Sequence, residues 1–454
     1  MNIMHRRNNR WVPSLVVAAL AAVTLSGCGS GNGAPSPSKL AAVADAPVQV
    51  AQTSRGNVAY RIIGSGPSLV LIMGYSGTME TWDPHFVDTL ARHFRVVIFD
   101  NTGTGKTAAL HSPLTIDAMA NQTSALMTAL HLGSSNVLGW SMGGMIAQAL
   151  AVLHPAQVRR LVLCATFPGN GTTVKPSQKN IDALTSQNSA TPTVLFPADQ
   201  VLAADAFLGS VAAYPVSAPV RASTVAAQGG ASLAWFNGQD VAGRQTPRIS
   251  VPTLVADGAN DHLDALANDH GLSALIPHSR LVLYPDAGHG FLFQEGAEFT
   301  FLVRTFLVGT PTPLSVTQMR QRYLAGFRTE LSAGSQWETA AKALTSKSTA
   351  RDLARIDVSL ADVAGAFDDE LLSFGATGSL GAALSASVSA NERNVNDLLA
   401  LGALSGATAK NYKATSAHDG AVGLALSNAL RRRLNLPPYT PPATTTTTRS
   451  LNNL

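Results

Sequence analysis

A serine with a glycine two residues before it and another two residues after it follows a short apolar run in the first half of the chain. Ser141 is the central residue of the pentapeptide GWSMG (residues 139–143), which lies between a strand-like segment, 136–140, and a helix-like segment. In a strand-turn-helix context this G-x-S-x-G pattern is typical of a nucleophile elbow, whose sharp turn leaves room only for small neighbours. The pattern predicts that Ser141 is a nucleophile and that Gly139 and Gly143 are the small residues of the elbow.

A serine nucleophile needs a base that takes its proton and a carboxylate that orients the base. Downstream of Ser141, one predicted strand leads into a turn that contains Asp261, and the next leads into a turn that contains His289. The chain order Ser, Asp, His is the order in which the triad residues occur in proteins whose nucleophile lies on such an elbow. Asp257 and Asp264 are alternatives for the acid, although Asp257 precedes the glycine of the turn.

The elements that would hold these residues follow from the alternation of short β-branched runs with helix-length segments. Eight strands are predicted, over residues 48–52, 58–63, 68–73, 95–100, 136–140, 160–165, 252–257 and 279–284. Runs such as LVLIM and VVIF are apolar throughout, as strands covered on both faces must be. The pattern predicts an α/β fold with a mostly parallel sheet, helices on both faces and an opening hairpin.

Two long segments break this alternation. Residues 167–250 carry aromatic side chains among small ones and are too numerous for a connecting loop, which predicts a cap inserted into a core of residues 47–166 and 251–308. Residues 314–436 are rich in Ala, Leu and Ser, and their helical spacing without strand-like runs predicts an all-helical C-terminal module of four or five helices. We expect the Pro/Thr-rich residues 437–454 to be disordered.

These motifs together resemble an α/β-hydrolase-fold serine hydrolase of the esterase and lipase type, over residues 48 to about 308. The resemblance implies that Ser141 is the nucleophile, Asp261 the acid and His289 the base. It implies hydrolysis of a carboxylic ester through an acyl-enzyme, with no metal ion and no organic cofactor.

The same resemblance implies an oxyanion hole made of two backbone N–H groups. One belongs to Met142, the residue after the nucleophile. The other belongs to Tyr75, which follows Met73-Gly74 at the position where the family usually has His-Gly. Because the hydrogen bond is donated by a backbone N–H group, we expect that Met73 in place of His changes the stabilisation of the oxyanion little.

Two kinds of alternative function remain open: other reactions catalysed by the same three residues, and a role that needs no catalysis. Acyl transfer, carbon-carbon bond hydrolysis and perhydrolysis can all proceed through such a triad, so the fold alone does not fix the reaction. The aromatic residues and scarce charges of the cap favour a small ester or lipid-like substrate. A different class is a non-catalytic binding module of the cell envelope, in which residues 314–436 would hold a protein partner.

Composition excludes several classes of protein. With 46% hydrophobic and 13% charged residues the chain is too apolar to be disordered, and two cysteines cannot form a disulfide framework or a four-thiolate zinc site. Three of the positive charges behind the formal net charge of +4 are Arg6, Arg7 and Arg10, and without them the charge is +1. We therefore expect no nucleic-acid partner.

One segment looks like a nucleotide-binding loop. Residues 100–107, DNTGTGKT, end in G-K-T after a predicted strand, but Asp100 stands where a P-loop has its first glycine. A carboxylate there would repel phosphate, and Pro113 would interrupt the helix that such a loop begins. We interpret this segment as a structural turn.

The first 28 residues have a basic start, an apolar run and the tetrapeptide LSGC, which ends at Cys28. The apolar run is shorter than the roughly 20 residues that cross a bilayer as a helix. The ending resembles a bacterial lipobox, which implies a signal peptide over 1–27 and lipidation of Cys28. We expect a protein of the bacterial cell envelope, lipid-anchored on the extracytoplasmic side of a membrane, with residues 28–46 as a flexible tether.

Overall fold

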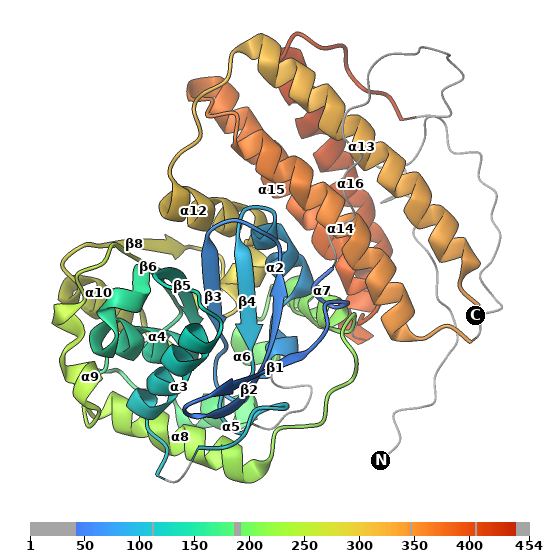
Figure 1. The fold of residues 1–454 in the computed structure, drawn as a ribbon. Helices are drawn as coiled ribbons and strands as arrows, with labels where there is room; N and C mark the ends of the chain where they lie inside the picture. The colour runs from blue at the N-terminus through green and yellow to red at the C-terminus, as the bar shows by residue number, and fades with distance from the viewer. Residues whose placement is uncertain (1–41, 111–112, 186–191, 346, 405, 442–454) are drawn as a thin grey trace. The chain divides into compact units, whose positions relative to one another are not determined.

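The computed structural model describes residues 42–110, 113–185, 192–345, 347–404 and 406–441 of the 454-residue chain. The described residues divide into two compact units (Figure 1). The first, here called the sheet unit, contains Lys39–Phe207 and Tyr214–Gly309. The second, called the helical unit, contains Leu208–Ala213 and Thr310–Leu454.

The sheet unit is built on one eight-stranded sheet with the strand order β1-β2-β4-β3-β5-β6-β7-β8. The strands are β1 (Gln49–Thr53), β2 (Gly56–Ile63), β3 (Ser68–Ile72), β4 (Arg95–Phe99), β5 (Ser135–Trp140), β6 (Val158–Cys164), β7 (Thr253–Gly258) and β8 (Ser279–Tyr284). The β1-β2 and β2-β4 pairs are antiparallel, and every later pair is parallel. This confirms the predicted α/β class with a mostly parallel sheet and an opening hairpin.

Strand boundaries differ from the sequence prediction by at most two residues, and β8 agrees at both ends. The strand β2 begins at Gly56 because pairing with β1 continues down to Thr53 opposite Gly56, past the apolar run from which the start at residue 58 was predicted. The strand β6 likewise begins at Val158, where it pairs with Ser135 across a local irregularity. Backbone pairing, which side-chain type does not show, sets these ends.

Helices cover the sheet because its central strands are apolar on both faces. Every residue of β5 and β7 is buried, as parallel strands between two helical layers must be. The helices that pack on the strands or on each other are α2 (Pro84–Ala91), α3 (Ile116–Ala129), α4 (Met142–Leu153), α10 (Leu266–Leu275), α11 (Phe291–Gln294) and α12 (Gly296–Val308). Asp83 and Thr115 cap the N-termini of α2 and α3 by accepting backbone N–H bonds.

The described part of residues 167–250 is helical. It contains α5 (Gln178–Thr185), α6 (Pro192–Leu195), α7 (Val201–Val211), α8 (Ala222–Phe236), α9 (Val241–Arg244) and a 3-10 turn. The helix α8 is fixed at its C-terminal end by Trp235, which is fully buried in the main core and whose Nε1 donates to the Phe167 carbonyl at 3.1 Å.

The helical unit is a bundle of long helices, which confirms the all-helical C-terminal region. Its helices are α13 (Val316–Ala343), α14 (Ala350–Leu372), α15 (Gly378–Ala400) and α16 (Gly406–Arg433). Consecutive helices pack on one another, and α16 returns to α13 through a 2.9 Å bond between the Tyr323 and Ser427 hydroxyls. The buried Arg431 guanidinium lies 5.6 Å from the centre of the Tyr323 ring and strengthens this closure.

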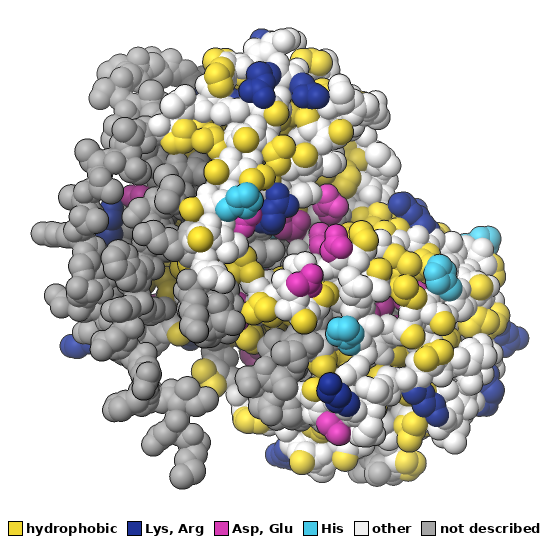
Figure 2. All heavy atoms as spheres, turned by 180° about the vertical axis from the view of Figure 1, so that it is seen from behind, with side chains coloured by type: hydrophobic (Ala, Val, Ile, Leu, Met, Phe, Trp, Pro, Cys, Tyr) yellow, Lys and Arg dark blue, Asp and Glu magenta, His cyan; other side chains and the backbone are white. Residues whose placement is uncertain are grey.

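Among the described residues, no helix has the length and apolarity needed to cross a membrane. On the face shown in Figure 2, basic side chains lie dispersed among acidic, apolar and neutral ones.

Candidate active site

Ser141 occupies a strained turn between β5 and α4. Its backbone has φ +57° and ψ −122°, a conformation that residues other than glycine rarely adopt. Surrounding bonds hold it there: Ser141 N donates to the Cys164 carbonyl at 2.8 Å, and the Thr166 hydroxyl donates to the Ser141 carbonyl at 2.7 Å. The strain turns the side chain out of the sheet, as in a nucleophile elbow.

The glycines around this turn lie where neighbouring backbone atoms are too close for a Cβ atom. A Cβ on Gly139 would overlap the carbonyl of Gly143, and a Cβ on Gly143 would overlap the carbonyl of Ile72 at the end of β3. A Cβ on Gly74 would lie 3.2 Å from the Ser141 Cβ. The loop after β3 therefore runs directly beside the serine.

The predicted base and acid lie against each other. The Nδ1 atom of His289 is 2.5 Å from Oδ2 of Asp261, and both side chains are almost fully buried. The other carboxylate oxygen of Asp261 accepts the backbone N–H groups of Leu263 and Asp264, at 2.6 and 2.9 Å. The Trp140 indole donates to the His289 carbonyl at 2.9 Å, which ties the histidine turn to the end of β5.

These residues meet because their strands are neighbours. Ser141 follows β5, Asp261 follows β7 and His289 follows β8, and the order β5-β6-β7-β8 is parallel throughout. The carboxyl ends of parallel strands lie along one edge of a sheet, so turns far apart in sequence meet there.

A pocket of about 320 Å³ opens at this edge within the sheet unit. Ser141 and His289 line it together with Trp140, the loop from Met73 to Thr78, Thr81, and the cap residues Leu184, Leu195 and Ser217–Val220. No Asp, Glu, Lys or Arg is among these described lining residues, so the histidine is the group that can gain a proton in an otherwise neutral lining.

The two predicted oxyanion donors flank the serine. Tyr75 lines the pocket directly after Gly74. Met142 is the first residue of α4, so its N–H has no acceptor one turn earlier in the helix. A carbonyl carbon held at Ser141 would place its oxygen near these two segments.

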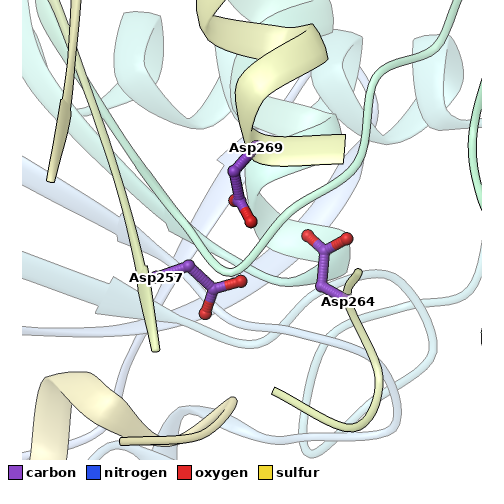
Figure 3. A group of neighbouring side chains, drawn as sticks. All are labelled: Asp257, Asp264 and Asp269. Carbon is purple, nitrogen blue, oxygen red and sulfur yellow. The ribbon is translucent and has the colours of Figure 1, made fainter. Parts of the chain in front are cut away.

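Sequence reasoning missed a cluster of three aspartates beside Asp261. The carboxylates of Asp257, Asp264 and Asp269 converge, with one oxygen of each within 4.8 Å of the others, and none is more than 1% exposed (Figure 3). Asp257 belongs to β7, Asp264 to the acid turn and Asp269 to α10. Four aspartates between residues 257 and 269 are the signal that could have shown it.

Carboxylate oxygens at such spacing could coordinate a hard cation, and among the described residues these three are the group with that geometry. Protons can relieve the same repulsion. Burial, and next the nearby charge of Asp261, raise the pKa of Asp269 to about 7. Burial also raises the pKa values of Asp257 and Asp264 well above the usual range. The cluster therefore holds protons near neutral pH, while Asp261 engages the histidine.

Replacing Gly143 with Ala should disrupt the elbow, because the new methyl group meets the Ile72 backbone rather than a movable side chain. We expect a loss of about 3 kcal/mol or more in the free energy of unfolding, measured by urea denaturation. Gly230→Ala is the matched control, since a Cβ there meets nothing within 4 Å in the middle of α8. Equal stability of Gly143→Ala and the wild type would contradict this account.

The raised pKa of Asp269 predicts a pH-dependent stability. Because the native state binds this proton more tightly than the unfolded chain, the contribution of Asp269 to stability is full below about pH 4, falls as pH rises toward 7, and levels off above it. Asp269→Asn should remove much of this fall, up to about 4 kcal/mol, and be more stable than the wild type at pH 8. Denaturation in EDTA at pH 4 to 8 measures it, with the exposed Asp286→Asn as control. Parallel wild-type and Asp269→Asn profiles would refute the assignment.

Comparison with known proteins agrees with this architecture. A solved α/β-hydrolase-fold protein from Chitinophaga pinensis, 25% identical, superimposes with a TM-score of 0.52 over 58% of this chain and 98% of its own. A poly(3-hydroxyalkanoate) depolymerase of Ectopseudomonas oleovorans is 28% identical over 53% of this chain and 83% of its own.

A Caulobacter protein with the provisional name carbamate hydrolase RutD is 28% identical over 55% of this chain and 96% of its own length. The family model described as alpha/beta hydrolase fold matches residues 67–296, about half of the chain and most of the sheet unit. The strand order, the elbow at Ser141 and this match lead to one conclusion: the chain belongs to the α/β-hydrolase family of hydrolases.

Proposed function

We propose that the protein hydrolyses carboxylic esters through a Ser141-His289-Asp261 triad. The observation that carries this proposal is the 2.5 Å contact of His289 with Asp261, made by a histidine that shares one pocket with Ser141. A carboxylate on Nδ1 keeps the proton on that nitrogen and leaves Nε2 free to accept the serine proton.

The reaction then follows from these atoms. His289 Nε2 takes the proton of Ser141 as its Oγ attacks the ester carbonyl, and the Met142 and Tyr75 N–H groups stabilise the tetrahedral oxyanion. The alcohol leaves with the proton from His289, and the acyl group remains on Ser141. Water attacks the acyl-enzyme by the same route in reverse, which releases the acid. Asp261 stabilises the imidazolium in both steps.

The pocket supports a neutral substrate of modest size. Its wall from the cap is Leu184, Leu195 and the segment Ser217–Val220, and no charged side chain is among its described lining residues. An ionised acyl or alcohol group would lose its hydration there without a partner charge. We therefore favour uncharged esters with an apolar acyl chain, and the names of the relatives as depolymerase and hydrolase agree with bond cleavage by water.

A fluorophosphonate probe tests the proposed chemistry. The soluble form that starts at Gly29 should gain one probe mass, and it should hydrolyse p-nitrophenyl butyrate and octanoate. Ser141→Ala should lose the label and at least about a thousandfold in kcat/KM, because no nucleophile remains. Ser385→Ala, an exposed serine of α15, should retain both.

Well-folded protein that takes up no label would refute the proposal and favour a binding role. Products measured with and without an added alcohol distinguish hydrolysis from acyl transfer, since transfer gives a new ester in place of the free acid.

We also propose that the protein is anchored through a lipid on Cys28, which lies outside the described residues. The support is the sequence pattern LSGC after a basic and apolar start. Full-length protein made in a bacterial host should enter the membrane fraction and incorporate an alkyne analogue of palmitate, and Cys28→Ser should do neither. Cys164→Ser is the matched control: this second thiol is fully buried, and burial raises its pKa, so its loss should leave labelling unchanged. Labelling of Cys28→Ser would contradict the anchor.

A further inference from the structure

The loop after β3, residues 73–77, carries one of the two proposed oxyanion donors and is itself strained. Ser76 has φ +59°, a value at which residues other than glycine are uncommon. On its sheet side the loop is held by Asn101, whose Nδ2 donates to the Met73 carbonyl at 2.8 Å. That bond lies at the start of the loop, and a 3.4 Å bond from Gly77 N to the Gly74 carbonyl closes the turn itself.

The helix α8 of the cap supplies two further contacts to the loop. The Tyr75 hydroxyl donates to the Val225 carbonyl at 3.0 Å, and Ser76 N donates to Oε1 of Gln228 at 2.9 Å. A Cβ on Gly229 would lie 3.2 Å from the Tyr75 hydroxyl oxygen, so the helix approaches the loop closely. The backbone N–H that follows the proposed donor is therefore fixed by one side chain that lies 152 residues away in sequence.

The helix α8 is a firm support for this contact. Ala231, Trp235 and Phe236 belong to the main hydrophobic core, and the Trp235 indole donates to the Phe167 carbonyl. Near its other end the Thr224 hydroxyl donates to the Gly103 carbonyl at 3.2 Å. Gln228 lies between these two attachments, one turn after Thr224 and about two turns before Trp235.

A glutamine at position 228 is energetically unfavourable, because the position is buried. Its side chain is fully buried, and its Nε2 finds no hydrogen-bond partner among the described residues. Burying an unpaired amide donor is unfavourable, and an apolar side chain of the same length would avoid it. What the glutamine provides is the acceptor Oε1, which is the atom bonded to Ser76.

We propose that Gln228 is a positioning residue for the oxyanion hole. By accepting the Ser76 N–H it fixes the Tyr75-Ser76 peptide and so limits rotation of the adjoining Gly74-Tyr75 peptide, whose N–H then faces the carbonyl oxygen of a substrate attacked by Ser141. The cap thus acts on the transition state as well as enclosing the substrate. This inference rests on the proposed function.

The test compares Gln228→Met, which removes the acceptor at similar length, with Gln228→Glu, which keeps an oxygen there. Two quantities are measured: kcat and KM for p-nitrophenyl butyrate, and the inhibition constant of butylboronic acid, whose tetrahedral serine adduct places an oxygen in the oxyanion hole. Gln228→Met should lower kcat about ten- to a hundredfold and weaken boronate inhibition by a similar factor, with KM changed by less than about threefold. Gln228→Glu should restore most of both.

Thr224→Val is the matched control, since it removes a bond of α8 without touching the loop. If it lowers kcat as much as Gln228→Met, the effect is general loosening of the cap and the proposal is wrong. Wild-type kcat and boronate affinity in Gln228→Met would also overturn it. Should Gln228→Met not fold, Gln228→Asn against Gln228→Glu makes the same comparison, because the shorter amide cannot reach Ser76. Failure of the proposed function is distinguishable, because the wild type itself would then take no label at Ser141.

Discussion

The conformation of Ser141 is the constraint on which the rest of the site depends. A non-glycine residue at φ +57° is stable only where its surroundings leave no alternative, and here the ends of β3, β5 and β6 provide those surroundings. This conformation requires glycine at positions 139 and 143, where the backbones of the strand, the turn and the helix approach too closely for a Cβ atom. The benefit is a serine beside the first N–H of α4 and beside the loop that begins at Gly74. The proposed nucleophile and its proposed oxyanion donors thus come from one packing arrangement.

Burial affects the protonation of the aspartates around the turn that contains Asp261. Both carboxylate oxygens of Asp261 have partners: one accepts two backbone N–H groups and the other contacts His289. Its three aspartate neighbours have oxygens without a hydrogen-bond partner in the described structure, and burial favours their protonated forms. Protons on these neighbours reduce the negative charge that is buried beside the Asp261-His289 contact.

The segment 100–107, which resembles a P-loop in sequence, forms a turn around the Asp100 side chain. Its Asp100 carboxylate accepts the backbone N–H groups of Met79 and Lys106, at 2.9 and 3.0 Å. A Cβ on Gly105 would overlap that carboxyl group, so the glycine leaves room for the Asp100 side chain. One backbone donor of the segment, the Lys106 N–H, is thus bound by the protein's own carboxylate instead of a phosphate. This arrangement agrees with the structural turn inferred from the sequence.

The sequence alone determined what depends on local pattern. Alternation of β-branched runs predicted all eight strands to within two residues, because side-chain type sets burial along a strand. The G-x-S-x-G pentapeptide and the order Ser, Asp, His predicted which residues meet at the sheet edge, since parallel strands bring their carboxyl ends together. Helical spacing predicted the C-terminal bundle in the same way.

The tertiary structure decided what depends on contacts between distant segments. No periodicity links Gln228 to Ser76, and no motif shows that Asp257, Asp264 and Asp269 lie together out of water. Their chemistry comes from burial and from the direction of each side chain, which are properties of the packed chain. The sequence can list residues capable of chemistry, but packing determines which are desolvated, which are paired and which hold another in place.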